Sequence, residues 1–326
     1  MIKNNKNLIS IIMPVYNSEK YISEAIDSVC NQSYTKWELI IVNDGSTDST
    51  PEIIDEYSKR DCRIKVFRRK NEGVSAARNF ALDNICGEYV TFIDSDDIYH
   101  IDRLKIMLQI FEQNPKCGAV FAGFKTFNGS IEANNEAVDV SKTELIEKDI
   151  LKTVISDTRK HFVWNVMLKS EIAKSEKFVP LRFAEDFCYS RDCARHFKQI
   201  AALDDVLYYY RRDNVNSMTS NFFAEKYIPD YMELVENIYG FCKKYKLNDN
   251  FYKKIVAHEY AQNSMRIRKS TSYKKFVECM NNRKFREGIE FADASQCTLF
   301  EKLLFYMVSH RIYIPFLFGF GKIFLI

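Results

Sequence analysis

Two spacings of hydrophobic residues alternate along the first third of the chain. Short apolar runs of strand length recur at residues 8–13, 37–42, 64–67 and 89–93. Between these runs, apolar residues are spaced three and four apart, as in the stretch after Ser18, which is typical of an amphipathic helix. Strands that alternate with helices predict a mainly parallel sheet with right-handed crossovers.

Residues that begin and end helices support this pattern. Thr50-Pro51 predicts the start of a helix, because proline is favoured in a first turn. A helix is expected over residues 74–85, closed by Gly87, and another over residues 101–113. The first part of the chain therefore reads as an α/β domain.

The pattern changes after about residue 128. A polar loop is expected over 128–139, then helical segments over 143–155 and 185–197. From about residue 221 the pattern is helical and aromatic, with no clear strand. We therefore expect an α/β domain over residues 1–220 and a helical, aromatic-rich C-terminal region over residues 221–326.

Composition places the chain among folded proteins. It is 46% hydrophobic and 28% charged, with only 10 Gly and 6 Pro in 326 residues, which excludes collagen-like, low-complexity and wholly disordered chains. The nine cysteines are odd in number and form no CxxC pair, which favours reduced thiols in a cytosolic protein.

Basic residues are concentrated near the C-terminus. Residues 221–326 hold 17 basic and 11 acidic side chains, a net charge of +6, against −3 for residues 1–220. Residues 299–326 are apolar and aromatic, but their longest uncharged stretch, 312–321, is too short to span a bilayer as a helix. We expect either contact with anionic lipid at a membrane surface or a helix packed on the α/β domain or a second subunit. The basic residues expected to face lipid are Arg266, Arg268, Lys269, Lys274, Lys275, Arg283, Lys284 and Arg286.

Carboxylates gather at the end of one predicted strand. Asp94, Asp96 and Asp97 follow the apolar run that ends at Ile93. Ligands of α/β sheets bind beyond the carboxyl ends of the strands. Neighbouring carboxylates repel one another unless a cation is bound, and oxygen ligands favour Mg²⁺ or Mn²⁺. The alternative is that one of these residues caps a helix.

Three other places hold candidate functional residues. Asp44 follows the second strand, where it either forms a turn or joins the site. Arg78 is a positive charge on an otherwise small and apolar helix face, and suits phosphate. The pair Glu185-Asp186 lies between aromatic residues, where partial burial raises a carboxylate pKa toward that of a general base. An acidic helix N-terminus is the alternative for this pair.

Five motifs in order resemble the family-2 inverting glycosyltransferases, a large group with the GT-A fold. They are IIMPVYN at 11–17, VNDGSTD at 42–48, NEGVSAARN at 71–79, FIDSDD at 92–97 and ED at 185–186. The resemblance covers about residues 1–220. It implies a nucleotide-diphospho-sugar transferase fold, of the type found in bacterial capsule and lipopolysaccharide synthesis.

The resemblance assigns the nucleotide to the first two motifs. Pro14 and Tyr16 would flank the base, with Asn17 beside them in the donor site. Asp44 would bind the uracil of a UDP-sugar.

It assigns the diphosphate and the metal to the next two motifs. Gly73 and Arg78 would lie near the diphosphate. Asp94, with Ser95, would contact the ribose side. Asp96 would hold the Mn²⁺ or Mg²⁺ that bridges the diphosphate, with Asp94 as a second ligand.

The last motif would supply catalysis. Asp186 would take a proton from the acceptor hydroxyl, and Glu185 would orient or support it. Attack opposite the leaving group would invert the anomeric configuration. Asp97 would support the metal site or cap a helix.

The acceptor site has weaker signals. Related bacterial enzymes often carry Trp-Asn-Lys-Leu-Tyr, whereas residues 164–168 read Trp-Asn-Val-Met-Leu. Trp164 either stacks on the acceptor sugar or packs in the core. Residues 210–212 and 216–219 also resemble a stretch near the donor phosphates of capsule and lipopolysaccharide enzymes.

The resemblance therefore predicts a UDP-sugar donor, a glycan or lipid-linked acceptor and a peripheral position at the inner face of the cytoplasmic membrane. A homodimer through the aromatic C-terminal third is a further expectation, and nucleic acid is not an expected partner. The alternative from another class is a catalytically silent sugar-nucleotide or carbohydrate-binding module at the membrane. No Walker GxxxxGK[ST] sequence occurs, which removes the commonest phosphoryl-transfer alternative.

Overall fold

A computed structural model describes residues 5–131, 138–214, 225–295 and 297–310. Contacts divide the chain into two compact units. The first holds residues 1–180 and 185–215, and the second holds 181–184 and 216–326. The boundary expected near residue 220 lies outside the described residues, as do residues 216–219 and 312–321.

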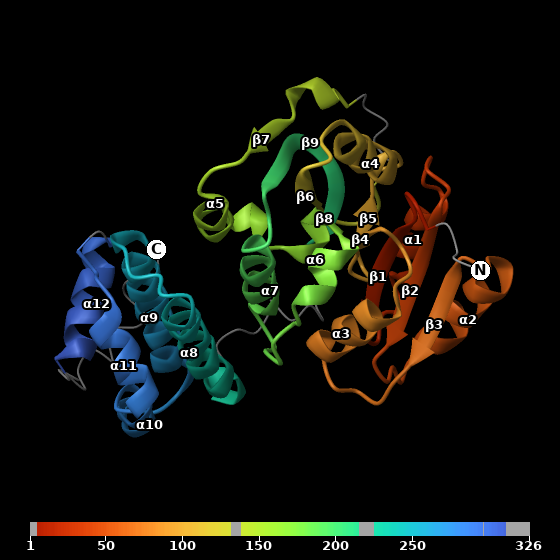
Figure 1. The fold of residues 1–326 in the computed structure, drawn as a ribbon. Coiled ribbons are helices and arrows are strands. Elements are labelled where there is room, and N and C mark those ends of the chain that lie inside the picture. The colour runs from red at the N-terminus through yellow and green to blue at the C-terminus, as the bar shows by residue number, and fades with distance from the viewer. Residues whose placement is uncertain (1–4, 132–137, 215–224, 296, 311–326) are drawn as a thin grey trace. The chain divides into compact units, whose positions relative to one another are not determined.

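The first unit is built on one twisted sheet (Figure 1). Its described strands are β1 (Ile9–Val15), β2 (Trp37–Asn43), β3 (Ile64–Arg68), β4 (Tyr89–Phe92), β5 (Ile98–Tyr99), β6 (Cys117–Phe127), β7 (Glu144–Ile146), β8 (Val166–Lys169) and β9 (Gln199–Arg211). They lie in the order β3-β2-β1-β4-β8-β6-β9-β5, and β7 pairs with β9. The α/β class is confirmed.

The sheet is mixed, which corrects the expectation of a mainly parallel one. Strands β3, β2, β1 and β4 run parallel, as the alternating pattern predicts. Strand β8 is antiparallel to both β4 and β6, and β5 and β7 are antiparallel to β9. These pairings join residues far apart in sequence, so local periodicity carries no sign of their direction.

The first four helices confirm the predicted elements to within two residues at most positions. They are α1 (Ile22–Cys30), α2 (Thr50–Arg60), α3 (Val74–Asn84) and α4 (Arg103–Gln113). Pro51 lies in the first turn of α2, as expected. The remaining helices of the unit are α5 (Ile150–Ser156), α6 (Ser170–Ser175) and α7 (Glu185–Ala194), with 3₁₀ turns η1 (Val140–Lys142), η2 (Thr158–Lys160) and η3 (Val163–Asn165).

The helix expected over residues 143–155 is wrong in its first half. Residues 144–146 form β7, and α5 begins only at Ile150. Between them Asp149 adopts a φ of +50°, a left-handed conformation that a continuous helix does not contain. Ile150, Val154 and Ile155 are buried on α5, whereas Leu145 on β7 is exposed, so apolar residues of two different elements imitate the spacing of one helix.

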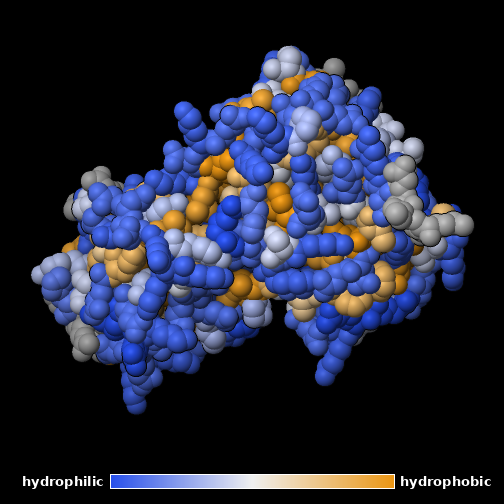
Figure 2. Space-filling view, in the orientation of Figure 1, coloured by the Kyte–Doolittle hydropathy of each residue, from blue (hydrophilic) through white to orange (hydrophobic). Residues whose placement is uncertain are grey.

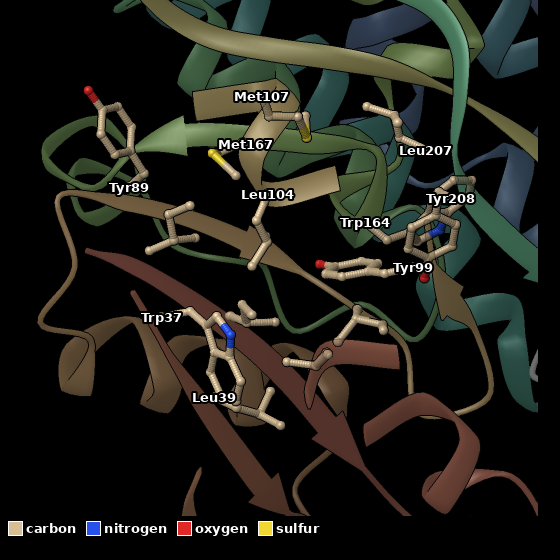
Figure 3. Close-up of a cluster of buried hydrophobic side chains, with 14 of the residues drawn as sticks. Trp37, Leu39, Tyr89, Tyr99, Leu104, Met107, Trp164, Met167, Leu207 and Tyr208 are labelled. Carbon is tan, nitrogen blue, oxygen red and sulfur yellow. The ribbon is translucent and has the colours of Figure 1, made fainter. Parts of the chain in front are cut away.

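Helices cover both faces of the sheet and create two hydrophobic clusters. One cluster joins α1 and α4 to the face that carries Trp37, and it also contains Trp164 and Tyr208 (Figure 3). The other joins α3, α5, α6 and α7 to the opposite face. All seven residues of β2 are buried, as in a strand covered on both sides. On the outside, Figure 2 shows a mainly hydrophilic face with small separate hydrophobic areas.

The second unit is helical, as expected. Its described helices are η5 (Glu225–Tyr227), α8 (Ile228–Lys244), α9 (Asn250–Ser270), α10 (Tyr273–Met280), α11 (Arg283–Phe291) and α12 (Leu299–Ser309). Buried side chains such as Tyr260 and Phe285 pack ring against ring between α9 and α11. Residues 181–184 join this unit because Arg182 pairs with Asp230 of α8.

Several of the basic residues predicted to face lipid have partners inside the second unit. Both terminal nitrogens of Arg286 donate to backbone carbonyls at the end of α12, at 2.6 Å each. Lys275, Arg283 and Lys284 form exposed ion pairs with glutamates, at 2.8–3.2 Å. None of the helices in the described ranges is both long and apolar enough to cross a membrane.

Candidate active site

The candidate residues line one edge of the sheet. Parallel strands β2, β1 and β4 all end at this edge, and β8 begins there because it is antiparallel to β4. Pro14 lies in β1 opposite Val42 of β2. Along the edge, Asp44 follows β2, Tyr16 follows β1, Asp94 follows β4 and η3 precedes β8. This is the edge at which α/β sheets bind ligands.

The Asp44 carboxylate organises the loop that leads into α3. Asp44 is buried, and its two oxygens accept hydrogen bonds from the backbone N–H groups of Glu72, at 3.0 Å, and Gly73, at 2.8 Å. Gly73 adopts a φ of +91°, a conformation that favours glycine. The conformation at Gly73 and the Asp44 carboxylate therefore fix the N-terminus of α3 beside β2.

The end of β1 is tied to the neighbouring loops by short side chains. Asn17 adopts a φ of +48°, and its Oδ1 accepts from the backbone N–H of Thr47 at 2.8 Å. Ser18 and Ser95 share a hydrogen bond of 2.7 Å between their hydroxyl groups. Tyr16, between these contacts, is 50% exposed. Three of the five motifs therefore meet around an exposed aromatic ring.

Asp97 is a structural anchor of the acidic turn. It is fully buried, accepts from the Tyr208 hydroxyl at 2.6 Å and accepts from the backbone N–H of Arg211 at 2.8 Å. Burial raises its pKa well above the usual range, and the charges of Asp96 and Asp94 add to this effect. It caps no helix, because α4 begins only at Arg103. Asp97 therefore joins the turn to β9.

Asp94 and Asp96 leave oxygen atoms available at the site. Asp96 accepts from the Asn214 side chain at 2.7 Å through one oxygen, and burial raises its pKa. Asp94 accepts from Arg78 through one oxygen at 3.1 Å. In the described ranges no three His, Cys, Asp or Glu side chains are grouped to hold a metal alone. Two carboxylates do fit a Mg²⁺ or Mn²⁺ site completed by water and substrate phosphate.

Arg78 gathers three carboxylates from distant parts of the sequence. Its Nη1 donates to Glu185 at 2.8 Å and to Asp186 at 2.6 Å, while Nη2 donates to Asp94 at 3.1 Å. Arg78 is only 3% exposed. Burial alone would lower its pKa, but Asp186, Asp94 and Glu185 together raise it, so the guanidinium stays charged. Sequence reasoning predicted phosphate contact for Arg78 and did not foresee this arrangement.

Asp186 lies in the first turn of α7 with an exposed edge. Its second oxygen accepts from the backbone N–H of Val163 at 3.3 Å. Burial raises its pKa well above the usual range, although the charge of Arg78 opposes this effect. Ala184, just before the pair, adopts a φ of +58°, a conformation that strains a residue other than glycine. A partly buried carboxylate with a raised pKa is a stronger base than a free aspartate.

Trp164 packs in the core. It is 4% exposed and stacks on Tyr208, with ring centroids 4.5 Å apart (Figure 3). It also stacks on Phe162, at 4.8 Å. Of the two alternatives open for Trp164, this structure therefore favours the packing role.

Several residues that shape the site carry no sequence motif. Tyr208 and Asn214 hold Asp97 and Asp96, and Arg103 donates to the backbone carbonyl of Trp164 at 2.8 Å. The nearest local signal is the resemblance at residues 210–212, which lies between Tyr208 and Asn214. The rest depends on tertiary contacts.

Comparisons with known proteins agree on one family. The model of the family described as "Glycosyl transferase family 2" matches residues 10–165. An "Uncharacterized glycosyltransferase" of Haemophilus influenzae is 36% identical over 196 residues, 60% of this chain and 75% of the relative. "Uncharacterized glycosyltransferase EpsJ" of Bacillus subtilis is 34% identical over 223 residues, 65% of this chain but only 63% of the relative.

A shorter match and a solved structure extend these findings. "Putative teichuronic acid biosynthesis glycosyltransferase TuaG" of Bacillus subtilis is 43% identical over 122 residues, 37% of this chain and 48% of the relative. The crystal structure of S. aureus TarS 1–349 in complex with UDP-GlcNAc superposes with a TM-score of 0.71 at 21% identity, covering 96% of this chain and 91% of the other. The latter similarity concerns the fold.

Proposed function

The chain belongs to glycosyltransferase family 2 and has the GT-A fold, and from this premise we propose that it transfers a sugar from a nucleoside-diphosphate donor to a hydroxyl group of a glycan. The observation that carries the proposal is the contact of Arg78 with Asp94, Glu185 and Asp186. Through this contact, a single side chain, Arg78, joins Asp94 on the expected donor side to Asp186, the expected base.

We take the donor to be a UDP-sugar. Tyr16 is exposed at the end of β1, where its ring and Pro14 would flank the uracil, with Asn17 bracing the loop. Asp44 would bind the uracil, and its bonds to backbone N–H groups hold it in place. The structural relative TarS was crystallised with UDP-GlcNAc, which supports the same nucleotide here.

The diphosphate would lie over the acidic turn and the N-terminus of α3. Asp96, with Asp94, would hold a Mn²⁺ or Mg²⁺ ion, and Ser95 and Gly73 would lie beside the ribose and the phosphates. When bound, the ion would neutralise charge that builds on the leaving diphosphate. The excess of carboxylates over arginine at this edge supports binding of a cation.

Asp186 would act as the general base. It takes the proton of the acceptor hydroxyl while that oxygen forms a bond to the anomeric carbon. The bond from this carbon to the diphosphate oxygen breaks on the opposite face, and its electron pair leaves with the UDP. The configuration inverts, so a UDP-α-sugar gives a β-linkage. Glu185 shares Arg78 with Asp186 and would orient it.

The acceptor is proposed to be a lipid-linked glycan in bacterial surface-polysaccharide synthesis, of the capsule or lipopolysaccharide type. The relative TuaG is named for teichuronic acid biosynthesis, which supports a polysaccharide product. The basic second unit would rest on the inner face of the cytoplasmic membrane, and it is also the region proposed for a homodimer contact.

Vesicle sedimentation tests the membrane proposal. The double variant Lys274→Glu, Lys302→Glu changes two exposed lysines outside the ion pairs described above. It should bind phosphatidylglycerol vesicles several-fold more weakly than the wild type. The membrane proposal is wrong if the variant and the wild type bind phosphatidylglycerol vesicles equally. It is also wrong if the wild type binds phosphatidylcholine vesicles as strongly as phosphatidylglycerol vesicles.

Product analysis tests the catalytic proposal. The protein is incubated with Mn²⁺, single UDP-sugars and a panel of glycosides, and UDP release and the anomeric coupling constant of the product are measured. We expect UDP release with a β-linked product, lost by about a hundred- to ten-thousandfold in Asp186→Asn. Donor binding without turnover in the wild type would instead favour the catalytically silent module.

A further inference from the structure

Two exposed aromatic rings flank the acidic turn. In the described part of the first unit, the large hydrophobic side chains that are exposed are those of Tyr16, Leu145 and Phe162. Leu145 lies in β7, away from the edge that carries the motifs. Tyr16 follows β1 and Phe162 precedes β8, and these two strands are the neighbours of β4. The two rings therefore lie on either side of Asp94.

Phe162 is held as a rigid surface. Its ring stacks on Trp164 with an interplanar angle of 11° and meets Phe124 edge-on at 6.1 Å. Trp164 in turn stacks on Tyr208, which is fixed by its bond to Asp97. Although the buried rings of Trp164 and Tyr208 lie behind it, 36% of Phe162 is exposed. An aromatic surface that is already ordered loses little entropy when a ligand binds.

The residue that follows Phe162 bonds to the proposed base through its backbone. Val163, the residue after Phe162, donates its N–H to Asp186 at 3.3 Å. The carbonyl of Phe162 accepts from Asn165 at 3.1 Å, and the carbonyl of Trp164 accepts from Arg103 at 2.8 Å. Each residue of the segment is thus anchored, and one peptide step separates the exposed ring from the group bonded to Asp186.

We propose that Phe162 is the acceptor platform: its ring stacks on the C–H face of the pyranose that receives the sugar and so presents a hydroxyl of that pyranose to Asp186. This inference rests on the proposed function and names the acceptor side of the same site. A pyranose ring exposes a face of C–H groups that packs on an aromatic ring, while its hydroxyl groups project from the rim. Such orientation of a reacting hydroxyl lowers the barrier to transfer.

The proposal separates two roles that the sequence assigned to Trp164 as alternatives. Trp164 supports the platform from beneath, and Phe162 makes the contact. Because a phenyl ring has no hydrogen-bonding group, it recognises the shape of the sugar face and not the pattern of its hydroxyls. The platform therefore accepts pyranoses that differ at one rim hydroxyl, and choice among them depends on other residues.

Saturation-transfer NMR tests the platform without turnover. The full chain, with UDP and Mn²⁺ present, is mixed with methyl β-D-glucopyranoside or methyl β-D-galactopyranoside, and transfer to the ring C–H protons is measured. We expect signals from both glycosides in the wild type, about tenfold weaker binding in Phe162→Ala and recovery in Phe162→Trp. Leu145→Ala, which removes an exposed side chain of the same unit, is the matched control and should bind as the wild type does.

Two results would overturn the platform. One is that the wild type lacks a signal from at least one of the two glycosides. The other is that the wild type and Phe162→Ala bind the glycosides equally. Recovery in Phe162→Leu to the same level as in Phe162→Trp also overturns it, because leucine is apolar but has no aromatic face. Calorimetric titration of the same samples with UDP tests the proposed function separately. Absence of UDP binding by the wild type counts against the donor site. UDP binding by the wild type without a glycoside signal counts against the role of Phe162 alone.

Discussion

The two halves of the sheet build the site in different ways. In the parallel half, β3-β2-β1-β4, several functional residues stand just after a strand, as Asp44 and Asp94 do. In the mixed half, the site is shaped by residues from separate elements, such as Val163 before β8 and Tyr208 within β9. The proposed donor side is therefore a series of local strand-to-turn units, whereas the proposed acceptor side forms only in the assembled fold.

Arg78 joins these halves. It belongs to α3 of the parallel half and binds Asp94 there, yet it also holds Glu185 and Asp186 at the start of α7. We infer from this that the spacing between the proposed donor site and the proposed base depends on one buried guanidinium. The following experiments test this comparison.

Replacement of Arg78 should have the largest effect. Arg78→Ala leaves three carboxylates, one of them buried and two partly buried, without their counter-charge, so we expect a loss of about 3–5 kcal/mol in the free energy of unfolding. Urea unfolding measures this loss. Arg68→Ala is the matched control, because Arg68 forms an exposed pair with Asp55 and its removal should cost less than about 1 kcal/mol. Equal losses in both variants would show that Arg78 does not join the halves.

The pH dependence of turnover tests the base on the mixed half. Asp186 acts in its deprotonated form, and burial raises its pKa, so kcat should fall as the pH drops through a value above the usual aspartate range of about 4. Below that value we expect about a tenfold loss per pH unit. A pH–rate profile of the wild type, with donor saturating, measures the midpoint. A midpoint within the ordinary aspartate range would contradict the raised pKa.

Tyr16→Ala should have the smallest effect, confined to the parallel half. Loss of stacking on the nucleotide base should raise the donor KM by about tenfold and leave the acceptor KM unchanged. Phe162→Ala should show the reverse, because its ring lies on the acceptor side. Steady-state kinetics with each substrate varied in turn separates these effects. If both variants change the same KM, the division into donor and acceptor sides is wrong.

The same comparison explains what the sequence could predict. Helices α1 to α4 and strands β1 to β4 follow from local spacing, because each buries its own apolar stripe or run against the sheet. Asp44, Asp94 and Asp96 followed from their position after strands. The direction of β8, the contact of Arg78 with Glu185 and Asp186, and the stack beneath Phe162 depend on contacts between separate elements that lie far apart in the sequence. Such contacts have no local period, which is why Trp164 remained ambiguous until the fold was known.

The central claim is that the donor site uses a divalent ion held at Asp96. Calorimetric titration of UDP, with and without Mn²⁺, on the wild type and on Asp96→Asn tests it most directly. We predict UDP binding that Mn²⁺ strengthens in the wild type and that the ion no longer strengthens in Asp96→Asn, with thermal unfolding of the variant close to that of the wild type. Equal strengthening by Mn²⁺ in both proteins, tight binding of UDP without the ion, or absence of UDP binding in the wild type would contradict the account.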